Sequence, residues 1–277
     1  MNQIATLGAM GTFSEIATKK YIEVSNKKLE ISYYPTIRQV FKAIGQECNL
    51  GIVPIENTLD GFVQRTLDLL LESDFYIVNE IIIPIQFSFV ANSQNISDIE
   101  KIYVQFKTRG QCYNFLDEFN QIKLITTESN SESFSQVKKG HIAEGAIIPR
   151  HLLDTKKDFS LCIDNVADSE HNQTRFIVLA KPKVAYKIDK TYKTSIIILE
   201  GVADQAGVLS KILNEFSSRD INLKSIISRP TKQELGKYYF FIDIEGHKYE
   251  EEIREALDKI RKNNLVKILG SYSLLGD

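Results

Sequence analysis

The chain has 277 residues, a formal net charge of −2 and charged side chains at 25% of its positions. This length is enough for two domains or one large domain with a sizeable core, and the small net charge gives no electrostatic reason to expect nucleic acid as a partner. No apolar run reaches the roughly 18–20 residues of a membrane span, and the N-terminus lacks the basic-then-apolar order of a signal peptide. We therefore expect a cytoplasmic protein that binds neither nucleic acid nor membrane.

The three cysteines, Cys48, Cys112 and Cys162, are widely separated and odd in number. This argues against a disulfide framework and against a zinc cluster. The four histidines show neither an HxxxH nor an HExxH spacing. We expect no metal and no cofactor.

Short β-rich runs alternate with amphipathic helical stretches over residues 1–180, which is typical of an α/β fold. The expected strands are 4–7, 30–34, 50–55, 75–91 (two strands around Pro84), 101–105, 122–127, 144–149 and 174–180. The expected helices are 14–25, 36–47, 60–73, 109–119, 131–139 and 149–155.

The composition changes at 181–193, where Pro182 and five lysines occur without helical or strand periodicity. This indicates a linker. Beyond it, 194–277 has the strand and helix order of a ferredoxin-like βαββαβ unit. The expected strands there are 194–202, 223–230, 238–246 and 266–275, and the expected helices cover 206–218 and 253–260.

A Gly-containing turn feeds a helix in the segment GAMGTFSEIA, at 8–17. Thr12 and Glu15 have the spacing of a capping box, and Ser14 is an alternative cap. The segment is either an ordinary strand-to-helix turn with a good cap, or a helix start whose free backbone N–H groups bind a carboxylate.

Two later segments contain the side chains that are the best candidates for binding or catalysis. In GIVPIENTLDG, the residues Glu56, Asn57 and Thr58 stand where a strand ends and a helix begins. In HNQTRFIVLA, Thr174 and Arg175 supply a hydroxyl donor and a permanent cation just ahead of an apolar strand. Together they suggest a pocket for a small anion with a proton donor beside it. Arg175 either binds that anion or pairs with an acid such as Glu56.

These segments resemble the signature motifs of prephenate dehydratases, namely a GPxGTFS-like turn, a VPIENS-type loop and an N-x-T-R-F terminus. Ala9 stands here for the proline and Thr58 for the serine. The resemblance implies conversion of prephenate to phenylpyruvate, with loss of water and CO2, in phenylalanine biosynthesis. It implies Thr174 as the catalytic residue that donates a hydrogen bond to the leaving hydroxyl. The implied substrate-binding residues are Thr12, Ser14, Asn57, Thr58 and Arg175.

The resemblance also implies a catalytic domain over 1–180 with two α/β lobes, like a periplasmic binding protein. Lobe one would comprise 1–78 and 170–180, and lobe two 85–165. The chain would cross between them near 77–84 and 165–172, and the side chains of Thr12, Asn57 and Thr174 would face the cleft.

The chain departs from the family in lobe two. The SHPQALxQC segment appears as VQFKTRGQC at 104–112, which keeps only Gln111 and Cys112, and the STA-type turn appears as Ser-Asn-Ser at 129–131. Two alternatives therefore stay open. One is a paralogue that processes prephenate or arogenate to a different outcome, such as decarboxylation without aromatisation. The other is a non-catalytic small-molecule-binding regulator.

Lys107 and Arg109 lie within this altered segment. They either supply positive charge to a substrate carboxylate in place of the lost residues, or simply belong to a solvated helix start.

The region 194–277 resembles an ACT domain. DQAGVL at 204–209 stands for a D-x-PGAL-like loop, and INLKSIISRP at 221–230 matches an INL…ESRP motif with Ile227 in place of the glutamate. The resemblance implies L-phenylalanine as a feedback effector, and a homodimer or homotetramer, because an ACT sheet edge usually pairs with another copy. The implied effector-binding residues are Gly207, Val208, Leu209, Asn222, Leu223, Ser228 and Arg229.

Overall fold

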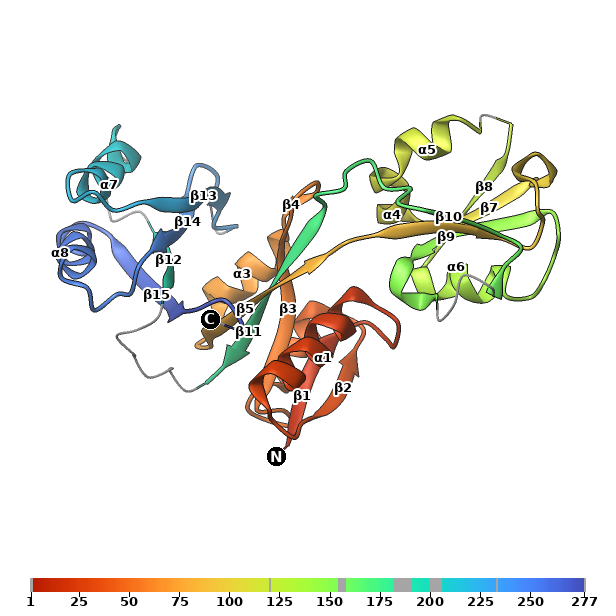
Figure 1. The fold of residues 1–277 in the computed structure, drawn as a ribbon. Helices are drawn as coiled ribbons and strands as arrows, with labels where there is room; N and C mark the ends of the chain where they lie inside the picture. The colour runs from red at the N-terminus through yellow and green to blue at the C-terminus, as the bar shows by residue number, and fades with distance from the viewer. Residues whose placement is uncertain are drawn as a thin grey trace.

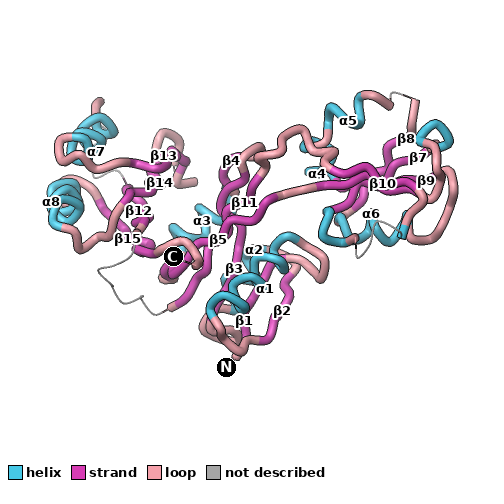
Figure 2. Tube along the Cα trace, viewed as in Figure 1, coloured by secondary structure: helices cyan, strands magenta, loops and turns pink. Residues whose placement is uncertain are grey.

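The computed structural model describes residues 2–119, 121–153, 158–181, 191–199, 206–232 and 234–276. Within these residues the chain forms three β-sheets with helices packed on them (Figures 1 and 2). The C-terminal sheet lies at one end, the sheet that contains both β1 and β11 lies in the middle, and the third sheet lies at the other end. The predicted α/β fold is confirmed.

The middle sheet and its helices are called lobe one. The strand order is β2-β1-β3-β11-β5, with the short β4 paired to β3. Because β1 and β3 are parallel while β11 is antiparallel to β3, the ends of β1 and β3 and the start of β11 meet at one edge of the sheet. The elements of lobe one are β1 (Gln3–Leu7), α1 (Phe13–Ser25), β2 (Glu30–Tyr34), α2 (Ile37–Ala43), β3 (Leu50–Asn57), β4 (Gly61–Phe62), α3 (Gln64–Glu72), β5 (Tyr76–Pro84) and β11 (Gln173–Ala180).

The third sheet and its helices are called lobe two, with strand order β10-β6-β9-β7-β8. The chain passes from β5 into β6 through residues 85–86, and returns from β10 to β11 through residues 165–172. The elements of lobe two are β6 (Phe87–Ala91), η1 (Ile96–Asp98), β7 (Lys101–Gln105), α4 (Phe106–Gln111), α5 (Tyr113–Asp117), β8 (Lys123–Thr127), α6 (Asn130–Val137), β9 (Glu144–Pro149), η2 (Arg150–Leu152) and β10 (Leu161–Asp164).

Three details of lobe two differ from the sequence-based prediction. The single helix expected over 109–119 is wrong: the Asp168 carboxylate accepts from the backbone N–H groups of Tyr113 (3.0 Å) and Asn114 (2.9 Å), which starts a new helix there. The helix expected over 149–155 is a short 3₁₀ turn, η2, and residues 154–157 lie outside the described part. The edge strand β10 was not predicted, because four residues are too few for a clear alternation of apolar and polar side chains.

The C-terminal sheet has the order β13-β14-β12-β15, which is the ferredoxin-like arrangement expected from the sequence. Its edge strands are β13 and β15. The elements are β12 (Lys193–Leu199), α7 (Val208–Ser217), β13 (Leu223–Pro230), β14 (Tyr238–Glu245), α8 (Glu251–Ile260) and β15 (Leu265–Tyr272).

The central strands β12 and β14 are buried on both faces of this sheet. Successive side chains of a strand point to opposite faces, so Phe240 and Ile242 of β14 pack on α7 and α8. Tyr239 and Phe241 instead join an apolar cluster that includes Val53 and Leu67 of lobe one. Burial on both faces explains why β12 and β14 read as continuous apolar runs rather than as alternating ones.

The linker prediction for 181–193 falls largely on residues 182–190, which lie outside the described residues, as do residues 200–205 with the first part of DQAGVL. Among the described residues, no helix is long and apolar enough to cross a membrane.

Candidate functional site

The start of β11 and the end of β3 bring Thr174 and Asn57 together as paired residues of the ladder. Both side chains are buried, with 9% of Thr174 and 8% of Asn57 exposed. The Asn57 amide nitrogen donates to the Thr174 hydroxyl oxygen at 2.9 Å and to Asn172 Oδ1 at 2.9 Å. It also lies 3.1 Å from the Gln173 carbonyl oxygen. Thr174 is thus held from one side by a donor group.

The direction of this hydrogen bond follows from the neighbouring backbone. Asn57 Oδ1 accepts from the backbone N–H groups of Leu59 (2.9 Å) and Asp60 (3.0 Å). Because a backbone N–H can only donate, the amide oxygen must face these groups and the amide nitrogen must face Thr174. Thr174 therefore accepts from Asn57 and keeps its own hydroxyl hydrogen, for which the described residues provide no acceptor.

A chain of hydrogen bonds continues from this pair into lobe two. Asn172 Nδ2 donates to Gln111 Oε1 at 3.0 Å, and Gln111 Nε2 donates to Asp60 Oδ2 at 2.9 Å. Since Gln111 ends α4 of lobe two and Asp60 belongs to lobe one, the chain joins the two lobes at the Thr174 site.

Sequence reasoning gave no role to Asn172 or Asp60. Both lie inside the segments that carry Thr174 and Asn57, and Asn172 is 1% exposed. A buried amide directly before the start of a strand needs partners, and an asparagine at this place in the sequence is the signal that could have identified it.

Thr58 lies beside the same strand start but is exposed. Its hydroxyl donates to the Gln173 carbonyl oxygen and accepts from the Gln173 backbone N–H, each at 3.1 Å. Both functions of the hydroxyl are therefore used to hold Gln173 against β3.

The predicted capping box starts α1 at the same edge of the lobe-one sheet. Thr12 is the N-cap, and its hydroxyl accepts from the Glu15 N–H at 3.3 Å and donates to the Ala9 carbonyl oxygen at 2.9 Å. Glu15 accepts from the Gly11 N–H (2.7 Å) and from the Tyr33 hydroxyl (2.6 Å). Burial alone would raise the pKa of the Glu15 carboxyl, but these hydrogen bonds and Lys19 lower it, so the cap stays ionised.

The first turn of α1 also leaves donor groups available. Among the described residues, the N–H groups of Phe13 and Ser14 have no acceptor. These two groups, with the positive end of the helix dipole, can bind a carboxylate.

Side chains of lobe two touch the turn before α1. Ser131 donates to the Met10 carbonyl oxygen at 3.1 Å, and His151 Nε2 lies 3.0 Å from the Gly11 carbonyl oxygen. Burial lowers the pKa of His151, which keeps the ring neutral. The turn at 8–12 and the Thr174 pair are therefore both at the boundary between the lobes.

The altered segment of lobe two begins with a helix cap. Gln105 Oε1 accepts from the N–H groups of Lys107 (2.8 Å) and Thr108 (3.2 Å). The side chains of Lys107 and Arg109 are exposed, as expected for a solvated helix start. Ser129 caps α6 in the same way.

Arg175 does not join the Thr174 group. Adjacent residues of a strand face opposite sides, so Arg175 shares the face of Ile177 and Leu179, which pack toward the C-terminal sheet. Its Nη1 lies 2.7 Å from Asp243 Oδ2 of β14, and its Nε lies 3.2 Å from Glu56 Oε2. Of the two roles considered from the sequence, the ion pair with Glu56 is the one observed, and the substrate contact expected for Arg175 stays a prediction.

The residues expected to bind an effector are spread over α7 and β13. Gly207 has φ = 86° at the N-cap of α7, and Val208 and Leu209 pack partly on the helix-covered face. Asn222 donates to Glu245 Oε2 at 2.8 Å, while Leu223 is half-buried and Ser228 is exposed.

Arg229, also expected among the effector ligands, pairs with an acid of lobe one. It donates from Nη2 to Asp68 Oδ1 of α3 at 2.9 Å, and from Nε to the same oxygen at 3.1 Å. Its guanidinium thus joins the C-terminal sheet to lobe one, and its expected place among the effector ligands stays a prediction.

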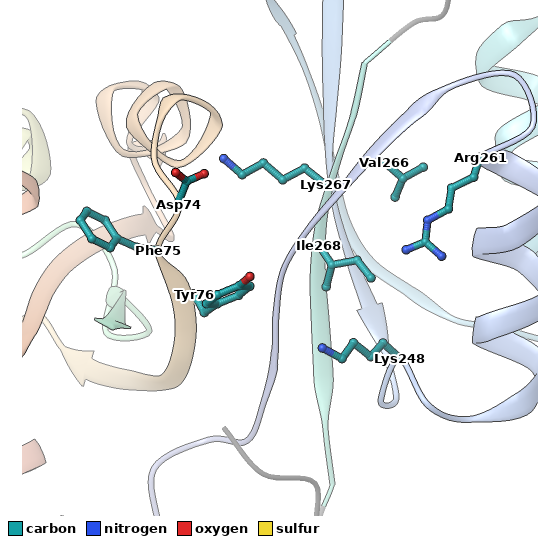
Figure 3. Close-up of a pocket in the computed structure, with 8 residues that line it drawn as sticks. All are labelled: Asp74, Phe75, Tyr76, Lys248, Arg261, Val266, Lys267 and Ile268. Atoms are coloured by element: carbon teal, nitrogen blue, oxygen red, sulfur yellow. The ribbon is translucent and has the colours of Figure 1, made fainter. Parts of the chain in front are cut away.

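A cavity of about 330 Å³ lies between lobe one and the C-terminal sheet, lined by Asp74, Tyr76, Lys248 and Arg261 among others. Figure 3 shows Lys267 reaching from β15 toward Asp74 at one side of this cavity. Its ammonium donates to the carbonyl oxygens of Leu70 (3.0 Å), Leu71 (2.9 Å) and Ser73, and so caps the C-terminal end of α3.

Comparison with known proteins gives a consistent picture. The family model described as prephenate dehydratase matches residues 4–184, and the ACT domain model matches residues 195–262. A bifunctional chorismate mutase/prephenate dehydratase of Aquifex aeolicus is 36% identical over 98% of this chain and 73% of its own length. A prephenate dehydratase of Methanocaldococcus jannaschii is 34% identical over 95% of this chain and 94% of its own. The crystal structure of a prephenate dehydratase from Arthrobacter aurescens in complex with L-Phe has a TM-score of 0.83 at 27% identity, covering 98% of this chain and 90% of that one.

Proposed function

Because this chain belongs to the prephenate dehydratase family and carries a C-terminal ACT domain, we propose that it converts prephenate to phenylpyruvate in phenylalanine biosynthesis. Prephenate is a cyclohexadiene with two carboxylates and a ring hydroxyl. The electron pair of one C–CO2 bond moves into the ring as the C–OH bond breaks, so the products are CO2, water and an aromatic ring. Aromatisation drives the reaction, and the leaving hydroxyl needs a proton or a strong hydrogen bond.

Thr174 is the residue that we assign to the leaving hydroxyl. The observation that carries this assignment is the hydrogen bond from Asn57, which makes Thr174 an acceptor toward the protein and leaves its hydroxyl hydrogen for the substrate. A threonine hydroxyl is too weak an acid to give up its proton outright near neutral pH. It therefore acts as a hydrogen-bond donor to the departing oxygen, with the proton supplied by water.

The substrate carboxylates are assigned to the start of α1. The N–H groups of Phe13 and Ser14 support this, because a helix N-terminus stabilises negative charge. Thr12 contributes by holding the turn rather than by direct contact, since its hydroxyl already donates to Ala9. Thr58 orients Gln173 in the same indirect way. No cofactor or metal enters this scheme.

L-Phenylalanine is the effector that we propose for the ACT domain. The related structure from Arthrobacter aurescens in complex with L-Phe supports this assignment, and Gly207 leaves open space at the start of α7 where a Cβ would meet nothing within 4 Å. The ligand would contact Gly207, Val208, Leu209, Asn222, Leu223 and Ser228.

We also propose that the chain associates into a homodimer or homotetramer through the edge strand β13. Ile226 of this strand is 39% exposed, and an unpaired edge is a template for pairing with a second copy. We keep the cytoplasm as the proposed location. Light scattering that finds a strict monomer at micromolar concentration would contradict the assembly.

The test is to mix the protein with prephenate at neutral pH and follow the products by alkaline absorbance and mass spectrometry. We expect phenylpyruvate from the wild type. Thr174→Val, which keeps the shape but removes the hydroxyl, should lower kcat by on the order of 10²- to 10³-fold, whereas Thr174→Ser should retain most of it. A decarboxylated product that keeps its hydroxyl, or binding without turnover, would overturn the proposal.

A further inference from the structure

The C-terminal sheet places a buried carboxylate next to the strand that carries Thr174. We propose that this group, Asp243 of β14, is a positioning residue for Thr174 and acts through Arg175. The inference rests on the proposed function, because the role it assigns is in the reaction that Thr174 serves.

Arg175 follows Thr174 directly and ties β11 to three other strands. Its Nη1 lies 2.7 Å from Asp243 Oδ2 on β14 and 3.4 Å from Glu80 Oε2 on β5, and its Nε lies 3.2 Å from Glu56 Oε2 on β3. The Arg175 side chain is 9% exposed, Glu80 7% and Asp243 0%, so solvent screens these two pairs only weakly. One side chain thus holds the strand against both of its neighbours and against the C-terminal sheet.

The strand needs such contacts at this point because its ladder with β3 is irregular. Arg175 is paired with Glu56, but the next pair is Phe176 with Pro54, so one residue of β3 is left without a partner. An irregularity of this kind interrupts the ladder and increases the local twist. The ladder with β5 is regular from Gln173 to Val178, so side-chain contacts such as those of Arg175 add to the ladder on the β3 side of the strand, where Thr174 pairs with Asn57.

Asp243 is itself rigidly held. It is fully buried and accepts hydrogen bonds from the hydroxyls of Ser195 and Ser225, the latter at 3.0 Å to the oxygen that faces Arg175. Both serines belong to the C-terminal sheet. Its position is therefore preset by that sheet, and Arg175 transmits this position to β11.

Asp243 also has a clear advantage over the other two acids as the anchor of Arg175. Glu56 is partly exposed, at 36% of its side chain, and Glu80 is shared with Lys193, whose ammonium lies 2.7 Å from it. Asp243 makes the shortest of the three contacts. Hydrogen bonds between a guanidinium and a carboxylate at this distance are among the strong ones in proteins.

A purely stabilising contact between the domains would have different consequences, and the chain offers a matched control. Asp68 of α3 pairs with Arg229 across the same domain boundary, and its hydrogen-bond partners Arg229, Lys232 and Tyr239 all belong to the C-terminal domain. Losing charge at Asp68 perturbs the boundary without perturbing Arg175.

The experiment compares Asp243→Asn with Asp68→Asn in the full-length protein, using prephenate as substrate and thermal unfolding to verify folding. We expect Asp243→Asn to lower kcat on the order of tenfold or more while KM stays within about twofold, and Asp68→Asn to keep both. In a Thr174→Val background, where no hydroxyl is left to position, Asp243→Asn should change the residual kcat by less than about twofold.

Equal kcat values for the two single variants would overturn the inference, as would an undiminished effect of Asp243→Asn in the Thr174→Val background. If Asp243→Asn does not fold, Ser225→Ala is the second variant, because it removes only one hydrogen bond from the same carboxylate oxygen. It should also lower kcat, but by less than Asp243→Asn. An unchanged kcat in Ser225→Ala would reject the role of Asp243. A wild type that makes no phenylpyruvate refutes the proposed function instead, so the two failures are distinguishable.

Discussion

Two buried polar clusters lie on opposite faces of β11, one residue apart, and they differ in kind. Around Thr174 the groups are amides and hydroxyls, and the first carboxylate, Asp60, is reached only through Asn172 and Gln111. Around Arg175 the groups are ions. The same strand therefore carries a neutral network on one face and a charged one on the other.

The neutral cluster and the charged cluster fix different properties of Thr174, namely the direction of its hydrogen bond and its position. An amide has one donor end and one acceptor end, so a chain of amides fixes the direction of every hydrogen bond in it. A guanidinium can only donate hydrogen bonds, and it can pair with any carboxylate within reach. It therefore fixes the positions of strands and does not select the direction of a hydrogen bond. The neutral face controls which atom of Thr174 is available to a substrate, and the charged face controls where Thr174 lies.

The largest expected effect is on stability, from breaking the charged cluster. Arg175→Met removes the cation but keeps most of the apolar stem. It leaves Asp243 without its ion-pair partner and Glu80 with Lys193. Removing one partner of a buried ion pair costs about 3–5 kcal/mol. Chemical denaturation should show a loss of that order, and a loss under about 1 kcal/mol would mean that the cluster behaves like a surface ion pair.

The next effect is on turnover, from reversing one hydrogen bond in the neutral network. Asn57→Asp keeps the shape of the side chain but offers Thr174 an acceptor in place of a donor, so the Thr174 hydroxyl hydrogen turns toward the protein. We expect kcat to fall on the order of 10²-fold. The unfolding midpoint should fall as well, because the buried carboxylate also faces Asn172 Oδ1 and the Gln173 carbonyl oxygen, which are both acceptors. Steady-state kinetics and thermal unfolding on the same preparation test this, and wild-type kcat would show that the hydrogen-bond direction is irrelevant.

The smallest effect concerns the pH dependence of stability and the second ion pair between the domains. Burial alone would raise the pKa of the Asp68 carboxyl, but hydrogen bonds from Lys232, Arg229 and Tyr239 lower it below its ordinary value. A carboxyl whose pKa is lower in the folded than in the unfolded state contributes stability that is complete above its ordinary pKa, near 4. That contribution is lost as the pH falls through the lowered value.

We therefore expect the wild type to lose stability more steeply than Asp68→Asn as the pH falls below about 4. Denaturant unfolding at a series of pH values measures both slopes. Parallel curves for the two proteins would mean that Asp68 titrates alike in the folded and unfolded states.

Most of the fold followed from local pattern. The strands expected at 30–34, 101–105, 144–149 and 223–230 have those bounds in the structure, because alternation of apolar and polar side chains, or a short apolar run between turn residues, is a property of neighbouring residues. The two helices α4 and α5 were joined in the prediction because the carboxylate that separates them, on Asp168, lies more than fifty residues further along the chain.

The sequence by itself determined the family, the α/β and βαββαβ patterns and the choice of Asn57 and Thr174 as candidate site residues. The tertiary structure alone decided which way the Asn57 amide points and where the two arginines go. The physical reason is that a charged side chain takes its partner by distance in space: Arg175 and Asp243 are 68 residues apart, and Arg229 and Asp68 are 161 apart. No local spacing encodes these pairs, and they are the contacts that join the C-terminal sheet to the strand carrying Thr174 and to α3.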